Sequence, residues 1–163
     1  QNPDYQIFAS TLEEEVGFSL KLRGEENEVI EQKIDECLRF VGLLDYKKMH
    51  PQRLSRGQRQ LLALASILVS DPKFIIADEP TSGLDENQGY MIMDKLYNLS
   101  KNGKTIMVIT HDLTMAKNYS NRLVALHEHR IQLDISTRNL EEYLDTLNAI
   151  GLDFHNIISF REV

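Results

Sequence analysis

Apolar and polar positions recur with helical spacing through the first part of the chain. The pattern predicts three helices, over residues 10–22, 26–41 and 55–69. Ser10 or Thr11 can cap the first of them, because glutamates follow at the capping-box distance. A glycine or an Asp-Pro pair stands shortly after each helix, where helices usually end. The N-terminal part is therefore expected to be a helical unit.

From residue 73 onward the pattern changes to strands and helices in alternation. The expected strands cover 74–77, 105–110, 122–126 and 131–135, and the expected helices cover 87–100, 113–119 and 139–147. The apolar run 74–77 favours a strand that is buried on both faces of a sheet. Alternation of this kind predicts an α/β fold with a parallel sheet, and the tail has strand potential at 157–160.

Composition narrows the class of protein. The chain has 163 residues and a mass of 18.8 kDa, about one domain, and its 42% apolar and 26% charged residues are typical of soluble globular proteins. No apolar run approaches the roughly 20 residues that span a bilayer, and residues 1–10 lack the features of a signal peptide. A net charge of −7 opposes binding to nucleic acid. The one cysteine, Cys37, lies on an apolar helical stripe, which favours a core position over a redox role.

The strand 74–77 leads into the most informative chemistry, the pair Asp78 and Glu79. Ligands of open α/β sheets bind beyond the carboxyl ends of the strands, where these carboxylates stand. Neighbouring residues of an extended chain point in different directions, so one carboxylate can hold Mg²⁺ while the other polarises a water. Acidic residues also end strands in ordinary surface turns, and the pair alone does not decide between the two readings.

Two further groups are candidates for contacts with an anion. His111 follows the strand 105–110 and is expected at the same rim of the sheet, where an imidazole can donate to a phosphate. The segment Leu54-Ser55-Arg56-Gly57-Gln58 opens the third helix and places free backbone N–H groups at its N-terminus. The alternative for Ser55 is that it only caps the helix.

Taken together, the motifs follow the order of one family. They are Gln1-Asn2-Pro3-Asp4-Tyr5-Gln6, Leu54-Ser55-Arg56-Gly57-Gln58-Arg59-Gln60, Asp78-Glu79-Pro80 with Thr81-Ser82-Gly83-Leu84-Asp85, and Thr110-His111-Asp112. With them the chain resembles the ATPase subunit of an ATP-binding cassette (ABC) transporter, from the Q-loop through the signature, Walker B and D-loop to the switch histidine. The resemblance covers about Gln1 to Leu133. Residues 1–17 are similar to the Q-loop region of energy-coupling-factor and cobalt-type importers, which implies import of a vitamin or a metal ion.

The resemblance implies ATP and Mg²⁺ as cofactors and a role for each motif residue. Asp78 would hold Mg²⁺, Glu79 would activate the attacking water, His111 would contact the γ-phosphate, and Gln1 would sense both the metal and the water. Ser55, Gly57 and Gln58 would bind nucleotide held by an opposing subunit, and Asp85 would link the two sites across the dimer. Arg56 departs from the glycine usual at its place in the signature.

One element that phosphoryl transfer needs in this fold is absent from the sequence. No G-x-x-x-x-G-K-[ST] loop occurs, and the nearest match, Gly103-Lys104-Thr105, lies between a helix and a strand rather than the reverse. We therefore expect the C-terminal portion of a P-loop NTPase: a RecA-like parallel sheet without its P-loop strand, which belongs between the strands 105–110 and 122–126. The expected parts are 1–72 (Q-loop, helical subdomain and signature helix), 73–135 (C-terminal half of the core) and 136–163 (an extension). The complete parent is expected to hydrolyse ATP, and the 163-residue chain alone is expected to be inactive.

The resemblance also implies partners and a location. These are a second ATPase subunit, identical or different, and a transmembrane subunit that docks in a groove near Tyr5, Phe8, Leu12 and Phe18, at the cytoplasmic face of the membrane. One rival is a chromosome-maintenance ATPase acting on nucleic acid, but the stretch between Gln1 and Leu54 has no room for long heptad arms. A second rival is an inactive interaction module, which has no need to combine Asp78, Glu79 and His111.

Overall fold

The structure, a computed structural model, describes residues 6–152 and divides the chain into two compact units, one up to Met107 and one from Val108. The predictions for Gln1, Tyr5 and the strand 157–160 lie outside the described residues. The part boundaries expected after residues 72 and 135 stay predictions.

Three helices form the first part of the N-terminal unit: α1 (Leu12–Leu22), α2 (Asn27–Val41) and α3 (Arg56–Leu68). Thr11 caps α1 with its side chain, and Gly42 ends α2 in the left-handed conformation at φ 77°. Two 3-10 helices, η2 (Leu44–Tyr46) and η3 (Pro51–Arg53), occupy the link between α2 and α3. The three predicted helices are confirmed, with bounds that agree within two residues.

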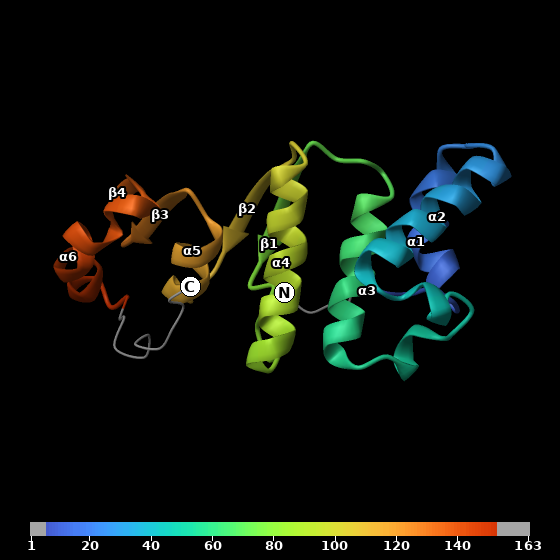
Figure 1. Ribbon diagram of the computed structural model, residues 1–163, viewed down its shortest axis with the longest axis horizontal. Helices are drawn as coiled ribbons and strands as arrows, with labels where there is room; N and C mark the ends of the chain where they lie inside the picture. The colour runs from blue at the N-terminus through green and yellow to red at the C-terminus, as the bar shows by residue number, and fades with distance from the viewer. Residues whose placement is uncertain (1–5, 153–163) are drawn as a thin grey trace. The chain divides into compact units, whose positions relative to one another are not determined.

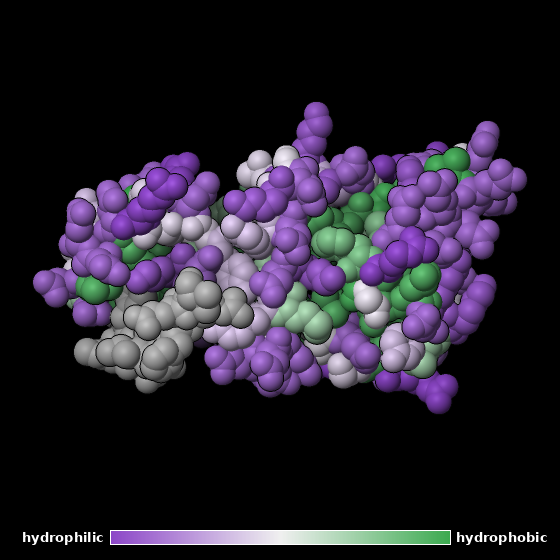
Figure 2. Space-filling view, viewed as in Figure 1, coloured by the Kyte–Doolittle hydropathy of each residue, from purple (hydrophilic) through white to green (hydrophobic). Residues whose placement is uncertain are grey.

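The three helices pack against one another through one apolar core (Figure 1). Its residues recur at helical spacing on each helix: Leu12, Val16 and Leu20 on α1, Ile30, Ile34 and Leu38 on α2, and Leu61, Leu62, Ala65 and Leu68 on α3. The approach of α1 to α2 is close at Gly17, where an added Cβ would lie 2.7 Å from Ile34 Cδ1. Figure 2 shows apolar side chains gathered around α3 within a mostly polar surface.

Cys37 lies on α2, is half-buried and forms no disulfide. Burial raises the pKa of its thiol to about 11, and the neighbouring Glu36 carboxylate adds to the shift. Only the thiolate is nucleophilic, so at pH 8 we expect iodoacetamide to alkylate Cys37 at least about 10²-fold more slowly than an ordinary exposed cysteine. The rate should keep rising with pH toward 11. Mass spectrometry measures it, with Ser100→Cys in a Cys37→Ala background as the exposed reference. Equal rates for the two cysteines at pH 8 would contradict this prediction.

The chain then forms β1 (Phe74–Asp78), α4 (Glu86–Lys101) and β2 (Thr105–Ile109), and the two strands are hydrogen-bonded neighbours in a parallel sheet. This confirms the predicted strand-helix-strand order. The prediction that 74–77 is buried on both faces is wrong: Ile75 is 3% exposed, but Phe74 is 51% and Ile76 is 55% exposed. Alternate residues of a strand face opposite sides of its sheet, so the side of Ile75 is packed while the side chains of Phe74 and Ile76 are about half exposed.

The C-terminal unit contains α5 (Leu113–Tyr119), the strands β3 (Arg122–His127) and β4 (Arg130–Ser136), η4 (Thr137–Tyr143) and α6 (Leu144–Ala149). β3 and β4 pair antiparallel, with a register irregularity between Ala125 and Leu126. Glu128 and His129 form the two-residue turn between the strands, both with positive φ, at 48° and 63°. The core of this unit is formed by Leu113, Leu123, Ala125, Leu140 and Leu147. Among the described strands β2 and β3 are not neighbours, and the P-loop strand placed between them stays a prediction.

The prediction of one helix over 139–147 is wrong in its start and its type. A 3-10 helix begins at Thr137 and gives way to α6 at Leu144. The Thr137 hydroxyl donates to the Ser120 carbonyl oxygen at 2.7 Å, which fixes the first residue of η4. In a 3-10 helix residues i and i+3 lie above one another, so Thr137 and Leu140 can both be buried.

Candidate functional site

The acidic pair stands where β1 ends. Asp78 is the last residue of the strand, and Glu79 turns the chain away from it with φ at 47°, a left-handed conformation that non-glycine residues seldom adopt. The turn is closed by the Ser82 N–H, which donates to the Glu79 carbonyl oxygen at 3.1 Å. Both side chains are half-buried. Strain of this kind persists where the surrounding structure holds it, which is common at functional sites.

Asp78 also borders a pocket of about 140 Å³ within the N-terminal unit. Its walls come from α3, β1 and α4 and are mostly apolar, with Gln6 and Gln60 as further polar residues. Among residues 6–152 no group of three or more His, Cys, Asp and Glu side chains can hold a metal ion. Mg²⁺ in nucleotide sites is instead bound by one or two carboxylates together with phosphates and waters. The single carboxylate of Asp78 fits that mode.

The signature residues form the first turn of α3. The Ser55 hydroxyl accepts from the Gln58 N–H at 3.2 Å, and Gln58 Oε1 accepts from the Ser55 N–H at 2.9 Å, a complete capping box. Gly57, which stands between Ser55 and Gln58 in the sequence, is buried. Ser55 therefore caps the helix, as one of the two sequence interpretations had it. The contact of Ser55 with nucleotide stays a prediction.

Asp85 caps α4 in the same manner, because its Oδ1 accepts from the Gln88 N–H at 2.9 Å. The Gln88 side chain in turn contacts Gly57, so the first turns of α3 and α4 lie together. The structure thus brings Asp85 into the neighbourhood of Ser55, Gly57 and Gln58.

His111 lies between β2 and α5, in the C-terminal unit. The backbone around it is fixed on both sides: the Asp112 N–H donates to Thr110 Oγ1 at 3.0 Å, and Asp112 Oδ1 accepts from the Met115 N–H at 3.0 Å. His111 is therefore held at the start of α5. Its approach to Asp78 and Glu79 stays a prediction.

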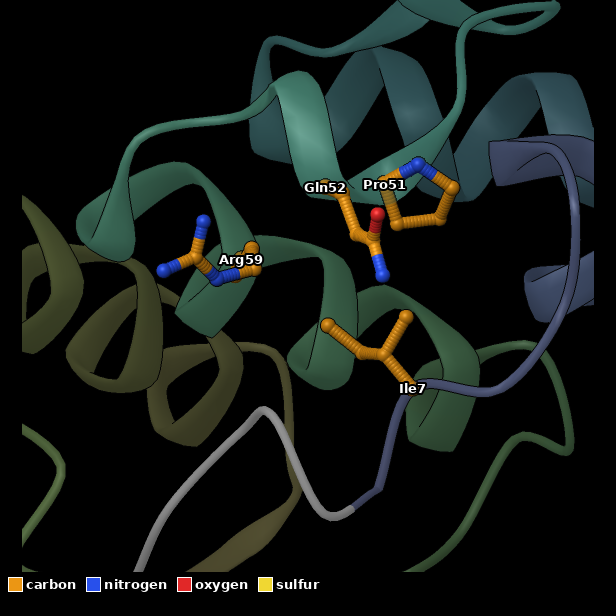
Figure 3. Close-up of a pocket in the computed structure, with 4 residues that line it drawn as sticks. All are labelled: Ile7, Pro51, Gln52 and Arg59. Atoms are coloured by element: carbon orange, nitrogen blue, oxygen red, sulfur yellow. The ribbon is translucent and has the colours of Figure 1, made fainter.

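A second pocket, of about 290 Å³, was not predicted (Figure 3). It is lined by Ile7, Pro51, Gln52 and Arg59, which come from the segment before α1, from η3 and from α3. The Arg59 guanidinium is held there by Nη1, which donates to the Leu54 carbonyl oxygen at 2.5 Å. No periodic signal marks this pocket in the sequence, because its lining comes from three separate segments.

The proposed docking groove near α1 needs one correction. Phe8 is 65% and Phe18 is 43% exposed, with their rings edge to face at 4.7 Å, but Leu12 is fully buried. Leu12 is the first residue of α1 and faces the helix core, so it cannot be a surface anchor. Glu15, also missed by sequence reasoning, is buried and accepts from the N–H groups of Phe8 at 3.0 Å and Ala9 at 2.9 Å. Its carboxylate therefore holds the segment that presents Phe8.

Comparison with known proteins agrees with the motifs and the fold. Residues 3–82 match the ABC transporter family. The chain is 42% identical over 152 residues to a putative ABC transporter ATP-binding protein of Methanosarcina acetivorans, covering 93% of this chain and 25% of that protein. It is 36% identical over its whole length to the energy-coupling factor transporter ATP-binding protein EcfA of Methanococcus maripaludis. Over its whole length the chain is therefore similar to ATP-binding proteins of ABC transporters.

Solved structures confirm the P-loop NTPase fold class of this chain. cbiO1 of Clostridium perfringens, part of the ABC transporter complex cbiONQ, has a TM-score of 0.82 and 29% identity, covering 96% of this chain and 62% of that one. The ATP-binding cassette MJ0796, a dimer bound to ADP and Pi, has a TM-score of 0.71 and 31% identity, covering 82% of this chain and 59% of that one.

The chain spans only part of its relatives, 59% of the EcfA protein and a quarter of the M. acetivorans protein. Within residues 6–152, no helix has the length and apolar content that crossing a membrane requires.

Proposed function

We propose that this chain belongs to the ATP-binding and ATP-hydrolysing subunit of an ABC importer for a vitamin or a metal ion. The observation that carries the proposal is the Asp78-Glu79 pair at the carboxyl end of β1, with Glu79 held in a left-handed conformation. That turn directs two consecutive carboxylates differently, as metal binding and proton transfer require. The net charge of −7 argues against a function on nucleic acid.

The proposed chemistry uses the chain's own residues in separate roles. Asp78 would hold Mg²⁺, which when bound neutralises charge on the phosphates. Glu79 would orient the attacking water and accept its proton at a carboxylate oxygen. His111 would donate a hydrogen bond to the γ-phosphate as charge develops there. Gln1 would contact the metal and the water.

A second ATPase subunit completes the proposed site. Ser55, Gly57 and Gln58 would contact nucleotide held by that subunit, since the first turn of α3 presents backbone N–H groups that suit an anion. Asp85 would link the two sites. The adjacency of the α3 and α4 first turns supports a shared surface, and MJ0796, a dimer with ADP and Pi, supports the mode of assembly.

The importer class and the membrane partner rest on similarity to EcfA and to cbiO1, part of the cbiONQ complex. We propose that the ABC ATPase sits peripherally on the cytoplasmic face of the membrane and docks a helix of a transmembrane subunit. Phe8, Phe18 and Leu22, the last 73% exposed, are the apolar anchors. Helix-in-groove recognition uses anchors of this kind.

Replacing His111 in the full-length protein tests the proposed function. His111→Ala should slow Mg-ATP hydrolysis by about 10²-fold, the usual cost of losing one donor to a developing negative charge. Phosphate release measures the rate. His129→Ala, in the exposed β3–β4 turn, is the matched control and should hydrolyse ATP like the wild type. Wild-type turnover by His111→Ala, or no hydrolysis by the wild type, would contradict the proposal.

Cysteine crosslinking tests the docking surface. In the assembled transporter, Phe8→Cys in a Cys37→Ala background should form a disulfide with a cysteine on a cytoplasmic helix of the membrane subunit, because Phe8 is one of the exposed anchors. Met91→Cys on α4, 40% exposed, is the control and should not crosslink. If Phe8→Cys fails with every cytoplasmic helix of an intact complex, the groove is elsewhere.

A further inference from the structure

Two side chains connect the first turn of α3 to the segment that leads into and begins α4. Arg56 on α3 contacts Gly83, and Gln88 on α4 contacts Gly57. The Arg56 guanidinium lies on Gly83: a Cβ built on Gly83 would be 2.5 Å from Arg56 Cζ and 2.7 Å from Nη2. The Gln88 amide lies on Gly57: a Cβ built there would be 2.7 Å from Gln88 Oε1 and 3.1 Å from Cδ. Real Cβ atoms do not approach other atoms this closely, so both contacts exist only because the residues are glycines.

The loop side of the contact has a backbone that suits it. Gly83 has φ of 70°, where side chains other than glycine are strained. On either side of it the loop is held by turns, with the Ser82 N–H donating to the Glu79 carbonyl oxygen at 3.1 Å and the Leu84 N–H donating to the Thr81 carbonyl oxygen at 3.2 Å. A flat guanidinium can therefore rest on an open stretch of ordered main chain.

Arg56 itself is in an electrostatically unfavourable place. It is the first residue of α3, and positive charge near a helix N-terminus opposes the helix dipole. The capping box of Ser55 and Gln58 already provides hydrogen bonds to backbone N–H groups of this turn without Arg56. The contact with Gly83 takes this side chain beyond its own helix.

We propose that Arg56 is a positioning residue that fixes residues 81–85 to the signature turn, so that Ser55 and Asp85 move as one body. The inference deepens the proposed function, because these are the residues proposed to face the opposing subunit. An arginine in place of the usual signature glycine thus adds a contact between two segments that the contact of Gln88 with Gly57 also joins.

Hydrogen exchange on the full-length protein without nucleotide tests the contact directly. In Arg56→Ala, the amides of Ser82 and Leu84 should exchange about tenfold faster than in the wild type, because the loop opens locally more often. Arg53→Ala is the matched control, since Arg53 is exposed in η3 three residues upstream, and should leave these amides unchanged. Amides in α1 and α2 should keep their wild-type rates, which separates local release from a general loss of folding.

A double-mutant cycle tests whether Arg56 acts through Gly83. Gly83→Ala should speed exchange of the same amides, because the added methyl group displaces the guanidinium, and Arg56→Ala should add little on top of it. Arg56→Lys, which keeps the charge and loses the planar group, should fall between Arg56→Ala and the wild type. Unchanged exchange in Arg56→Ala, or additive effects of the two substitutions, would overturn the proposal. Neither outcome depends on ATP hydrolysis, so a failure of the proposed function would appear separately in the turnover assay.

Discussion

Glu79→Gln in the full-length protein should slow ATP hydrolysis by about 10²–10⁴-fold and leave ATP binding unchanged, because the amide keeps the size of the side chain but cannot accept a proton. Glu79 is suited to act as the base since it follows the last residue of β1 in a sharp left-handed turn, beyond the carboxyl end of the strand. Phosphate release gives the rate, and calorimetric titration with Mg-ATP gives the affinity.

Glu86→Gln is the control for this experiment. This substitution makes the same change of charge in the first turn of α4, where the Glu86 side chain is exposed. We expect it to hydrolyse ATP at the wild-type rate. If Glu79→Gln also turned over at the wild-type rate, the carboxylate that acts on water would have to be another one. If it lost ATP binding, its role would be in holding nucleotide rather than in proton transfer.

The second large effect concerns stability. Leu12→Ala should lower the free energy of unfolding by about 2–5 kcal/mol, the usual cost of truncating a buried leucine in a packed core. Leu12 is 0% exposed and lies in the core that α1 shares with α2 and α3. Denaturant unfolding followed by circular dichroism measures the change.

Phe8→Ala is the contrasting substitution. Phe8 is 65% exposed, and its main aromatic partner is Phe18, a ring pair worth about 0.5–1.5 kcal/mol. It should therefore destabilise the protein less than Leu12→Ala while weakening the association with the proposed membrane subunit. A loss below about 1 kcal/mol for Leu12→Ala would mean that the site collapses around the smaller side chain or that the helix core is placed wrongly.

Much of the fold follows from local signals in the sequence. The helices have apolar stripes and clear ends, such as the Ser55 and Gln58 capping box at the start of α3 and Gly42 at the end of α2. The strands are short apolar runs, and β1 and β2 begin at the predicted residues. These features depend on residues close together in the sequence, which is why pattern alone finds them. The motif residues of the candidate site were likewise predicted from short segments of the sequence.

What the sequence does not reveal depends on contacts between distant segments. Periodicity cannot tell whether a face of β1 is covered, so the exposure of Phe74 and Ile76 was not predicted. The start of the 3-10 helix at Thr137 depends on the bond between Thr137 and the distant Ser120. The buried Glu15 has the sequence context of an ordinary surface glutamate, and only the fold brings its carboxylate to the backbone of Phe8 and Ala9.

The turn between β3 and β4 has a practical consequence for labelling the protein. Glu128 and His129 both adopt left-handed backbone, a conformation that asparagine and glycine accept with less strain, and both are exposed. The pairing of His127 with Arg130 closes the ladder beneath them, and the core residues Leu123 and Ala125 lie further along β3. A short glycine-rich insertion carrying an epitope or a fluorophore would relax this tip rather than distort it. The hairpin is therefore a suitable attachment point for following the protein in its assembly.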